Sequence, residues 1–216
     1  MFVELVDLLR CPRPHEDTWL VAASEATAGR HIVRGTLGCP VCEAEYPIRD
    51  GVVLFDADAA AANAPADAPL PHWDDGERAA EAMRLAALLD LSTSGGTVVL
   101  GGTWQLCADA LLDLADVRVL LVDPPRAPDM REEVSAVRGA VLPIAPNAVR
   151  GIALDDRTAT PDRVTAAAHA LRPRGRLVAP VAAALPDSVT ELARDARHWV
   201  AEREPAPPKL VPLARG

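Results

Sequence analysis

The sequence is poor in aromatic residues and lysine, and it has no long apolar run. Aromatic side chains make up 3% of the 216 residues, and lysine occurs only as Lys209. The longest apolar stretches, such as 117–122, have the length of a strand, whereas roughly 20 residues are needed to cross a bilayer. The N-terminus carries Glu4 and Asp7 and lacks the basic start of a secretory signal. We therefore expect a cytoplasmic protein with no membrane segment.

Basic charge is also scarce, and it is unevenly distributed. The net charge is −9 and the sequence pI is about 5.0. Residues 1–56 contain five Arg or Lys and nine Asp or Glu, residues 57–96 contain two and seven, and residues 97–216 contain fifteen of each. This balance argues against a nucleic-acid partner, because a binding footprint on phosphates is basic. Arg172, Arg174 and Arg176 could form a local phosphate patch, or a solvated turn.

The composition that remains is that of a globular protein, and its pattern divides the chain into three zones. Apolar residues make up 50% and charged residues 25% of the sequence, so wholesale disorder is excluded. Residues 1–56 hold three of the four cysteines. Residues 57–72 are rich in Ala, Pro and Asp without apolar periodicity, which is typical of a linker. Residues 73–216 alternate between strand-like and helix-like segments.

This third zone predicts an α/β sheet. Strands that alternate with helices of about 10–15 residues favour a parallel, doubly wound sheet, and two successive final strands suggest an antiparallel pair at one edge. We expect helices over 77–91, 104–114, 129–137, 161–171 and 187–197. We expect strands over 97–100, 117–122, 140–142, 151–154, 175–180, 198–202 and 209–214.

The cysteines of the first zone predict a metal site. Cys39 and Cys42 are separated by two residues, so both thiolates can reach one tetrahedral Zn²⁺ from a tight turn. Cys11 and His15 could supply the other two ligands. A short segment with few large apolar side chains also benefits from such a cross-link. The alternatives are three cysteines without metal, and a His15 that is a solvated loop residue. A disulfide framework is disfavoured in a cytoplasmic chain.

Three stretches of the first zone resemble the small zinc-ribbon proteins that activate RNA and protein methyltransferases. They are residues 5–12 (LVDLLRCP), 39–42 (CPVC) and 46–52 (YPIRDGV). The resemblance implies a zinc-ribbon-like domain over 1–56. The family usually has a second Cys three residues after the first, and Pro14 stands there. Either His15 replaces it, or the site has three protein ligands, or it is empty.

The third zone carries a candidate nucleotide site. Parallel sheets bind ligands beyond the carboxyl ends of their strands, where the strand order switches. Gly101 and Gly102 follow the first strand and would let the backbone approach a ligand ahead of a helix N-terminus. Asp123 follows the second strand, 22 residues after Gly101, near the spacing of about 20 expected for a carboxylate that binds a ribose. Alternatively, the glycines form only a tight turn and Asp123 only caps a loop.

The third zone also resembles the class I S-adenosylmethionine-dependent methyltransferases over nearly its whole length. The resemblance implies a seven-stranded, mostly parallel, Rossmann-like sheet over 73–216, with S-adenosylmethionine held by Gly101, Gly102 and Asp123. The matching stretches are 97–103, 119–123, 142–149, 170–178, 199–200 and 210–211. The chain departs from the family in lacking an acidic residue in 98–102 and near 148–150. Trp104 also stands where a small residue is usual, either filling the cofactor's space or packing in the core.

Two functions follow from these resemblances. The first is an S-adenosylmethionine-dependent methyltransferase-like protein with a built-in zinc ribbon, with Asp155 or Asp156 as the carboxylate nearest the methyl acceptor. The second is a non-catalytic pseudo-methyltransferase that serves as a scaffold or subunit. The activator family docks on separate methyltransferases, so we expect the ribbon to dock on the α/β domain of its own chain. A protein partner or a homo-oligomer is also expected. Cys107 is expected to be a small core residue.

Overall fold

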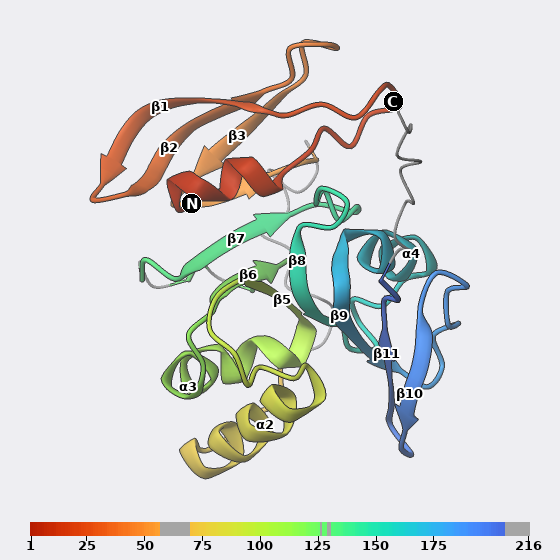
Figure 1. The fold of residues 1–216 in the computed structure, drawn as a ribbon. Helices are drawn as coiled ribbons and strands as arrows, with labels where there is room; N and C mark the ends of the chain where they lie inside the picture. Colours follow the sequence, from red (N-terminus) through yellow and green to blue (C-terminus); the bar gives the residue numbers. More distant parts are fainter. Residues whose placement is uncertain (57–69, 126, 129–130, 206–216) are drawn as a thin grey trace, which may run out of the picture.

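The strands of the chain form one mixed sheet (Figure 1). The computed structural model describes residues 1–56, 70–125, 127–128 and 131–205. The eleven strands lie in the order β1-β2-β3-β4-β7-β6-β5-β8-β9-β11-β10. Their bounds are β1 Val21–Ala28, β2 His31–Gly38, β3 Glu45–Arg49, β4 Val52–Leu54, β5 Thr97–Gly101, β6 Arg118–Val122, β7 Val134–Arg138, β8 Val149–Ala153, β9 Leu171–Pro180, β10 Thr190–Arg194 and β11 His198–Glu202. The helices are the 3₁₀ segments η1 Val3–Leu8 and η2 Gly102–Cys107, and the α-helices α2 Asp75–Leu88, α3 Ala108–Leu114 and α4 Pro161–Ala170.

The centre of the sheet is parallel and its two flanks are antiparallel. Strands β4, β7, β6, β5, β8 and β9 pair in parallel, whereas β9 pairs antiparallel with β11 and β11 with β10. Counted from β5 as the first, seven strands run 3-2-1-4-5-7-6, and the order switches between β5 and β8. The predicted α/β class is confirmed. The predicted sheet of seven strands is wrong in extent, because β4 pairs with β7 and continues the sheet through β3, β2 and β1.

Each face of the sheet has its own core. Side chains alternate between the faces, so Val98 and Leu100 of β5 belong to the core that contains Leu85 of α2, while Val99 belongs to the opposite one. Helices α2 and α3 cover the first face (Figure 1). Helix α4 and the N-terminal residues, including Leu5 of η1, cover the second. Among the helices described, none is both long and apolar enough to span a membrane.

Local signals explain the helices that the sequence predicts correctly. Asp74 and Glu77 form a capping box at the start of α2, each side chain accepting a hydrogen bond from the other's backbone N–H. Thr160 caps α4 and Pro161 occupies its first turn, as predicted. The predicted helix 104–114 is a 3₁₀ turn, η2, followed by the short helix α3.

Three predicted elements are wrong. The predicted helix 129–137 contains β7, whose residues are buried between β4 and β6, and short apolar runs do not distinguish buried strands from helices. The predicted helix 187–197 contains the exposed edge strand β10. Residues 140–142 form no strand. The closing antiparallel pair is β10 with β11; the predicted strand 209–214 lies outside the described residues.

The first 56 residues are joined to the parallel strands by backbone hydrogen bonds. Val53 pairs with Val137, and Arg10 N–H donates to the carbonyl of Pro143 at 2.9 Å. Ala145 N–H donates to the carbonyl of Leu8 at 2.8 Å. The predicted linker 57–72 lies outside the described residues except for its last three, and the predicted domain boundaries stay a prediction.

Candidate functional site

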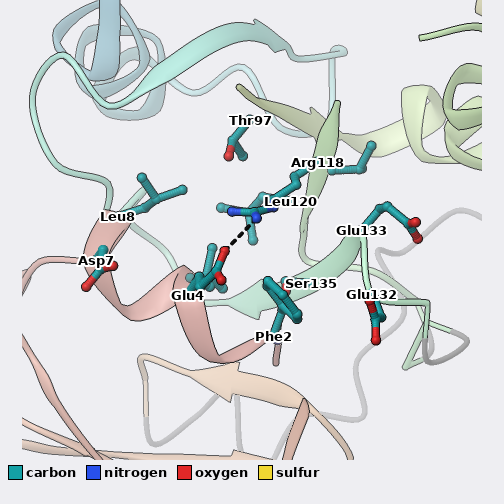
Figure 2. Close-up of a pocket in the computed structure, with 12 residues that line it drawn as sticks. Phe2, Glu4, Asp7, Leu8, Thr97, Arg118, Leu120, Glu132, Glu133 and Ser135 are labelled. Carbon is teal, nitrogen blue, oxygen red and sulfur yellow. Dashed lines mark hydrogen bonds and ion pairs between the residues drawn. The ribbon is translucent and has the colours of Figure 1, made fainter. Parts of the chain in front are cut away.

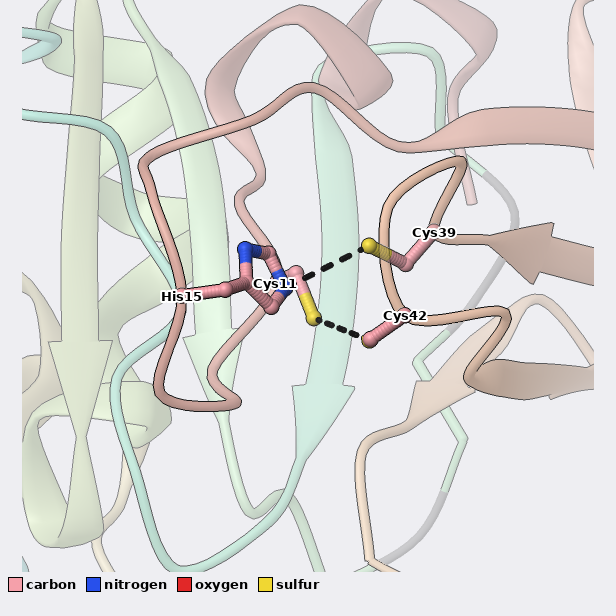
Figure 3. A group of neighbouring side chains, drawn as sticks. All are labelled: Cys11, His15, Cys39 and Cys42. Carbon is pink, nitrogen blue, oxygen red and sulfur yellow. Dashed lines mark hydrogen bonds between the residues drawn. The ribbon is translucent and has the colours of Figure 1, made fainter.

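The four predicted metal ligands come together in the N-terminal region (Figure 3). Cys11 and His15 lie on the loop after η1, and Cys39 and Cys42 lie on the turn between β2 and β3. The ligand atoms of these four residues all lie within 4.8 Å of one another. The turn is closed by Cys39 N–H donating to the carbonyl of Ala44 (2.8 Å) and Glu43 N–H donating to that of Cys39 (3.0 Å).

The spacing of these atoms fits tetrahedral zinc. The Sγ atoms of Cys11 and Cys42 are 3.7 Å apart, and Cys39 Sγ is 3.4 Å from Nε2 of His15. Zn–S bonds of about 2.3 Å and Zn–N bonds of about 2.0–2.1 Å at tetrahedral angles place S···S at about 3.8 Å and S···N at about 3.6 Å. The cluster is therefore compatible with a Cys₃His zinc site, in which His15 supplies the ligand that Pro14 cannot.

Local hydrogen bonds stabilise the charged form of one thiol. Burial raises the pKa of the Cys39 thiol, but hydrogen bonds from the backbone N–H groups of Cys42 and Val41 outweigh this and lower its pKa to about 6. A thiolate is the form that binds metal. The pKa of His15 is raised by its hydrogen bond to the carbonyl of Glu16.

Tyr46 is a supporting residue that the sequence analysis did not assign to the site. Its hydroxyl lies 3.1 Å from Cys11 Sγ, and its ring packs on that of Phe55 at 4.8 Å. Burial and the contact with Cys11 raise the pKa of the Tyr46 hydroxyl, so it stays protonated and shares a hydrogen bond with the sulfur. Such outer partners orient metal ligands. The signal was its position four residues after Cys42, on a strand that faces the cluster.

The predicted nucleotide-site residues lie at the switch in strand order, on neighbouring strand ends. Gly101 ends β5, Gly102 begins η2, and Asp123 follows β6, which pairs with β5. Gly102 has φ +62°, a left-handed conformation that favours glycine. A Cβ on Gly102 would overlap the carboxylate of Asp155, which follows β8.

The Asp155 carboxylate fills the space beside this loop. It accepts hydrogen bonds from the backbone N–H groups of Thr103 (2.8 Å), Arg157 (3.1 Å) and Thr158 (3.2 Å). It also accepts one from the Thr158 hydroxyl, at 3.0 Å. The loop amide that could bind a ligand's anionic group is therefore bonded to a carboxylate of the chain itself.

Asp123 is likewise bonded within the chain. One carboxylate oxygen accepts from Gly139 N–H at 3.0 Å, and the other forms an ion pair with Arg163 of α4. The Arg163 side chain is 8% exposed and also donates to the carbonyls of Gly139 and Ala140. Nothing in the sequence marked Arg163, because arginine in the first turn of a helix is ordinary.

Trp104 belongs to the core rather than to a cleft. Its indole N–H donates to the carbonyl of Leu154 at 3.3 Å, its ring lies 5.2 Å from that of His198, and it is buried on the α2 face. Cys107 is buried beside it and donates to its carbonyl at 3.0 Å, and burial raises the Cys107 pKa to about 12. The core role predicted for Cys107 is confirmed.

The remaining candidates do not converge on one site. Arg176 forms ion pairs with Asp90 and Glu202, while Arg172 and Arg174 are exposed. Asp156 lines a cavity with Pro161 and Pro180, and Gly101, Gly102 and Asp123 are not part of its lining. The predicted phosphate patch and the predicted acceptor carboxylates therefore stay predictions.

No protein-family model and no curated protein matches the sequence significantly. Solved structures that match part of the chain include a "putative sarcosine dimethylglycine methyltransferase" from Galdieria sulphuraria (16% identity, TM-score 0.40, 47% of this chain and 45% of that chain). A geranyl diphosphate methyltransferase in complex with SAM matches at 16% identity and TM-score 0.40, over 53% of this chain and 56% of that one. A "putative s-adenosyl-l-methionine-dependent methyltransferase" from Methanococcus maripaludis matches at 10% identity and TM-score 0.41, over 67% and 99%. The match spans less than half of the first of these chains, and likenesses this weak do not define a family.

Proposed function

We propose that this chain is a zinc-binding scaffold or subunit on a methyltransferase-like sheet, and that it does not use S-adenosylmethionine. The proposal rests on one observation: other residues of the chain already bond the groups that would hold the cofactor. Asp155 bonds to the Thr103 amide, and Arg163 pairs with Asp123. A cofactor would have to displace the buried Asp155 carboxylate and the buried Arg163 side chain from these bonds, and breaking the Arg163–Asp123 pair alone costs about 2–4 kcal/mol, because Asp123 is partly exposed.

The exposed residues near the metal cluster support a role in binding another protein. Trp19 is 67% exposed, just before β1, and Val41 is exposed on the turn that carries Cys39 and Cys42. The guanidinium of Arg10 lies 5.2 Å from the Trp19 ring centre. Tryptophan and arginine are enriched at the residues that dominate protein interfaces. The zinc ribbon would hold these side chains in place.

Calorimetry tests whether these internal bonds prevent cofactor binding. Zinc-loaded full-length protein, titrated with S-adenosylmethionine and S-adenosylhomocysteine up to millimolar concentration, should give no saturable heat. One-to-one binding below about 100 μM, lost in the variant Asp123→Ala, would contradict the proposal and assign the cofactor site to Gly101, Gly102 and Asp123.

Affinity purification tests the scaffold role. A stoichiometric partner should be retained by the parent protein and lost by Trp19→Ala, with zinc content and Tm unchanged. Met83 is also exposed, on α2 and away from the cluster, so Met83→Ala is the matched control and should retain the partner. Equal retention by both variants would count against an interface at Trp19.

The second candidate is a methyltransferase, and one observation favours it. Gly101, Gly102 and Asp123 lie together at the switch in strand order, where parallel sheets bind ligands. In that case Asp123 would bind the ribose, and S-adenosylmethionine would supply the methyl group. The side chains of Asp155 and Arg163 would then have to rotate away. Methyl transfer needs mostly positioning, so a transferase should show cofactor binding even without its acceptor.

A further inference from the structure

A cavity of about 220 Å³ lies between η1 and the sheet, at the edge opposite Gly101 and Asp123 (Figure 2). It is lined by N-terminal residues on one side, and by the first residues of β5 and β6 and the turn before β7 on the other. It therefore lies between the N-terminal segment and the parallel strands. Its apolar walls include Phe2, Leu5, Leu8 and Leu120. Ligand pockets often occur where two structural units meet.

A hydroxyl group points into this cavity. Thr97, the first residue of β5, is 8% exposed. Its side chain has no hydrogen-bond partner within the described parts of the chain, and Figure 2 shows its oxygen directed toward the ring of lining residues. The oxygen is reached by solvent from the cavity, so it is free to accept a hydrogen bond from a ligand there.

The mouth of the cavity is acidic. Four carboxylates line it, from Glu4, Asp7, Glu132 and Glu133, against the single guanidinium of Arg118. Glu4 pairs with Arg118 and with Arg30, while the other three carboxylates have no ion pair with any residue whose position is described. Arg30 and Arg118 also lie against the ring of Phe2, at 5.1 and 5.2 Å, so this ring is already occupied. The three remaining carboxylates leave an excess of negative charge here, which favours cations.

We propose that this cavity is a binding site for a small aliphatic amine. The apolar walls would hold the carbon chain, the Thr97 hydroxyl would accept a hydrogen bond from an ammonium group, and Asp7, Glu132 and Glu133 would balance its charge. The volume lies below the range of about 300–1,000 Å³ typical of drug-sized ligands, so the ligand is short. The site is independent of the metal cluster and of the proposed scaffold role.

Calorimetry with 1,4-diaminobutane on the zinc-loaded full-length protein tests the site. We expect saturable one-to-one binding that weakens with added salt, and no binding of butanoate. The variant Thr97→Val keeps the shape of the side chain and should weaken binding about tenfold, because it removes a hydrogen bond to a charged donor. Thr27→Val, on the exposed strand β1, is the matched control and should bind as the parent does.

A second pair of variants tests the charge. Glu132 and Glu133 are exposed, so the double variant Glu132→Gln/Glu133→Gln should fold and should weaken binding about tenfold, while Asp113→Asn on α3 should not. If Thr97→Val does not fold, the double variant still tests whether the cavity binds an amine. The proposal is overturned by the absence of saturable binding, by full affinity in the double variant, or by equal losses in Asp113→Asn and the double variant. The last result would mean general attraction to an acidic protein.

Discussion

The metal cluster and the predicted nucleotide site at the switch in strand order differ in what their residues bind. At the cluster, three sulfurs and one imidazole converge within 4.8 Å, and the hydrogen bonds with Tyr46 and from backbone N–H groups leave these ligand atoms facing one another. At the predicted nucleotide site, Asp123 and the Gly102 loop are bonded to Arg163 and Asp155 of the same chain. Both regions have the residue types that the sequence analysis expected. They differ in whether the groups that would bind a ligand are already engaged by charged side chains of the chain.

This difference separates a ligand site from a structural one. Three thiols and an imidazole within 4.8 Å of one another form a donor set that a metal ion can bind, and metal binding itself favours the thiolate form. A carboxylate that accepts four hydrogen bonds needs nothing more. We therefore expect the stability of the protein to depend strongly on metal at the cluster. At the predicted nucleotide site we expect it to depend on the internal bonds instead.

The largest effect should come from breaking the cluster. The variant Cys39→Ser should bind little zinc, and its unfolding free energy should fall by about 5 kcal/mol in the presence of zinc, since a bound metal stabilises only the folded state. Elemental analysis and thermal denaturation measure both effects. Cys107→Ala is the control and should keep its zinc, because Cys107 lies in the opposite core. Normal zinc content in Cys39→Ser would show that the cluster is not the site.

The next effect concerns the ion pair between Arg163 and Asp123. Arg163→Met keeps most of the side-chain stem but leaves Asp123 and two carbonyls without their donor. We expect a loss of about 2–4 kcal/mol by urea unfolding, below the full value for a buried pair because Asp123 is partly exposed. Arg49→Met, at the exposed end of β3, should change stability by less than about 0.5 kcal/mol. If Arg163→Met lost as little stability as Arg49→Met, the ion pair would not be strong enough to keep a cofactor from Asp123.

A smaller effect should come from the loop glycine. Gly102→Ala introduces a Cβ into the Asp155 carboxylate at a positive φ, so we expect a loss of about 2–3 kcal/mol. Gly29 has a similar φ of +57° but open space around it, so Gly29→Ala should lose only about 1 kcal/mol. Denaturant unfolding of both variants isolates the contact with Asp155. Equal losses would mean that Asp155 does not pack against the loop.

The smallest effect should come from the turn that supports Trp104 through His198. Hydrogen bonds from the backbone N–H groups of His198 and Arg197 lower the pKa of Asp195 to about 2. A carboxyl group whose pKa is lowered by folding stabilises the protein above its unfolded pKa, and this contribution is lost as the pH falls toward 2. Asp195→Asn should therefore lower Tm slightly at pH 7, and the difference should vanish near pH 2. A difference independent of pH would point to a steric cause.

Sequence reasoning reached the cluster because its signals are local. The spacing of Cys39 and Cys42 defines a turn by itself, and His15 needed only to lie within reach of it. The helix α4 was predicted for the same reason, from Thr160 and Pro161. Strand β7 was missed because its identity depends on pairing with β4 and β6, which no local pattern encodes.

The internal bonds at the predicted nucleotide site could not be predicted either. The residues that form these bonds, Asp155 and Arg163, lie 52 and 40 positions from their partners, Thr103 and Asp123. The sequence placed Gly101, Gly102 and Asp123 at strand ends, where they are found. It held no sign that their hydrogen bonds would be made within the chain, because that outcome depends on how α4 packs across the sheet.

The pairing of β4 with β7 has a consequence for how the chain is made. Residues 52–54 leave the ribosome early, but their parallel neighbours, residues 136–138, are synthesised more than 80 residues later. At about 5–20 residues per second, this interval lasts several seconds, during which one side of β4 has no partner. The antiparallel strands β1 to β4 can pair locally in that time. Until residues 136–138 are made, the free edge of β4 remains a place where aggregation can begin.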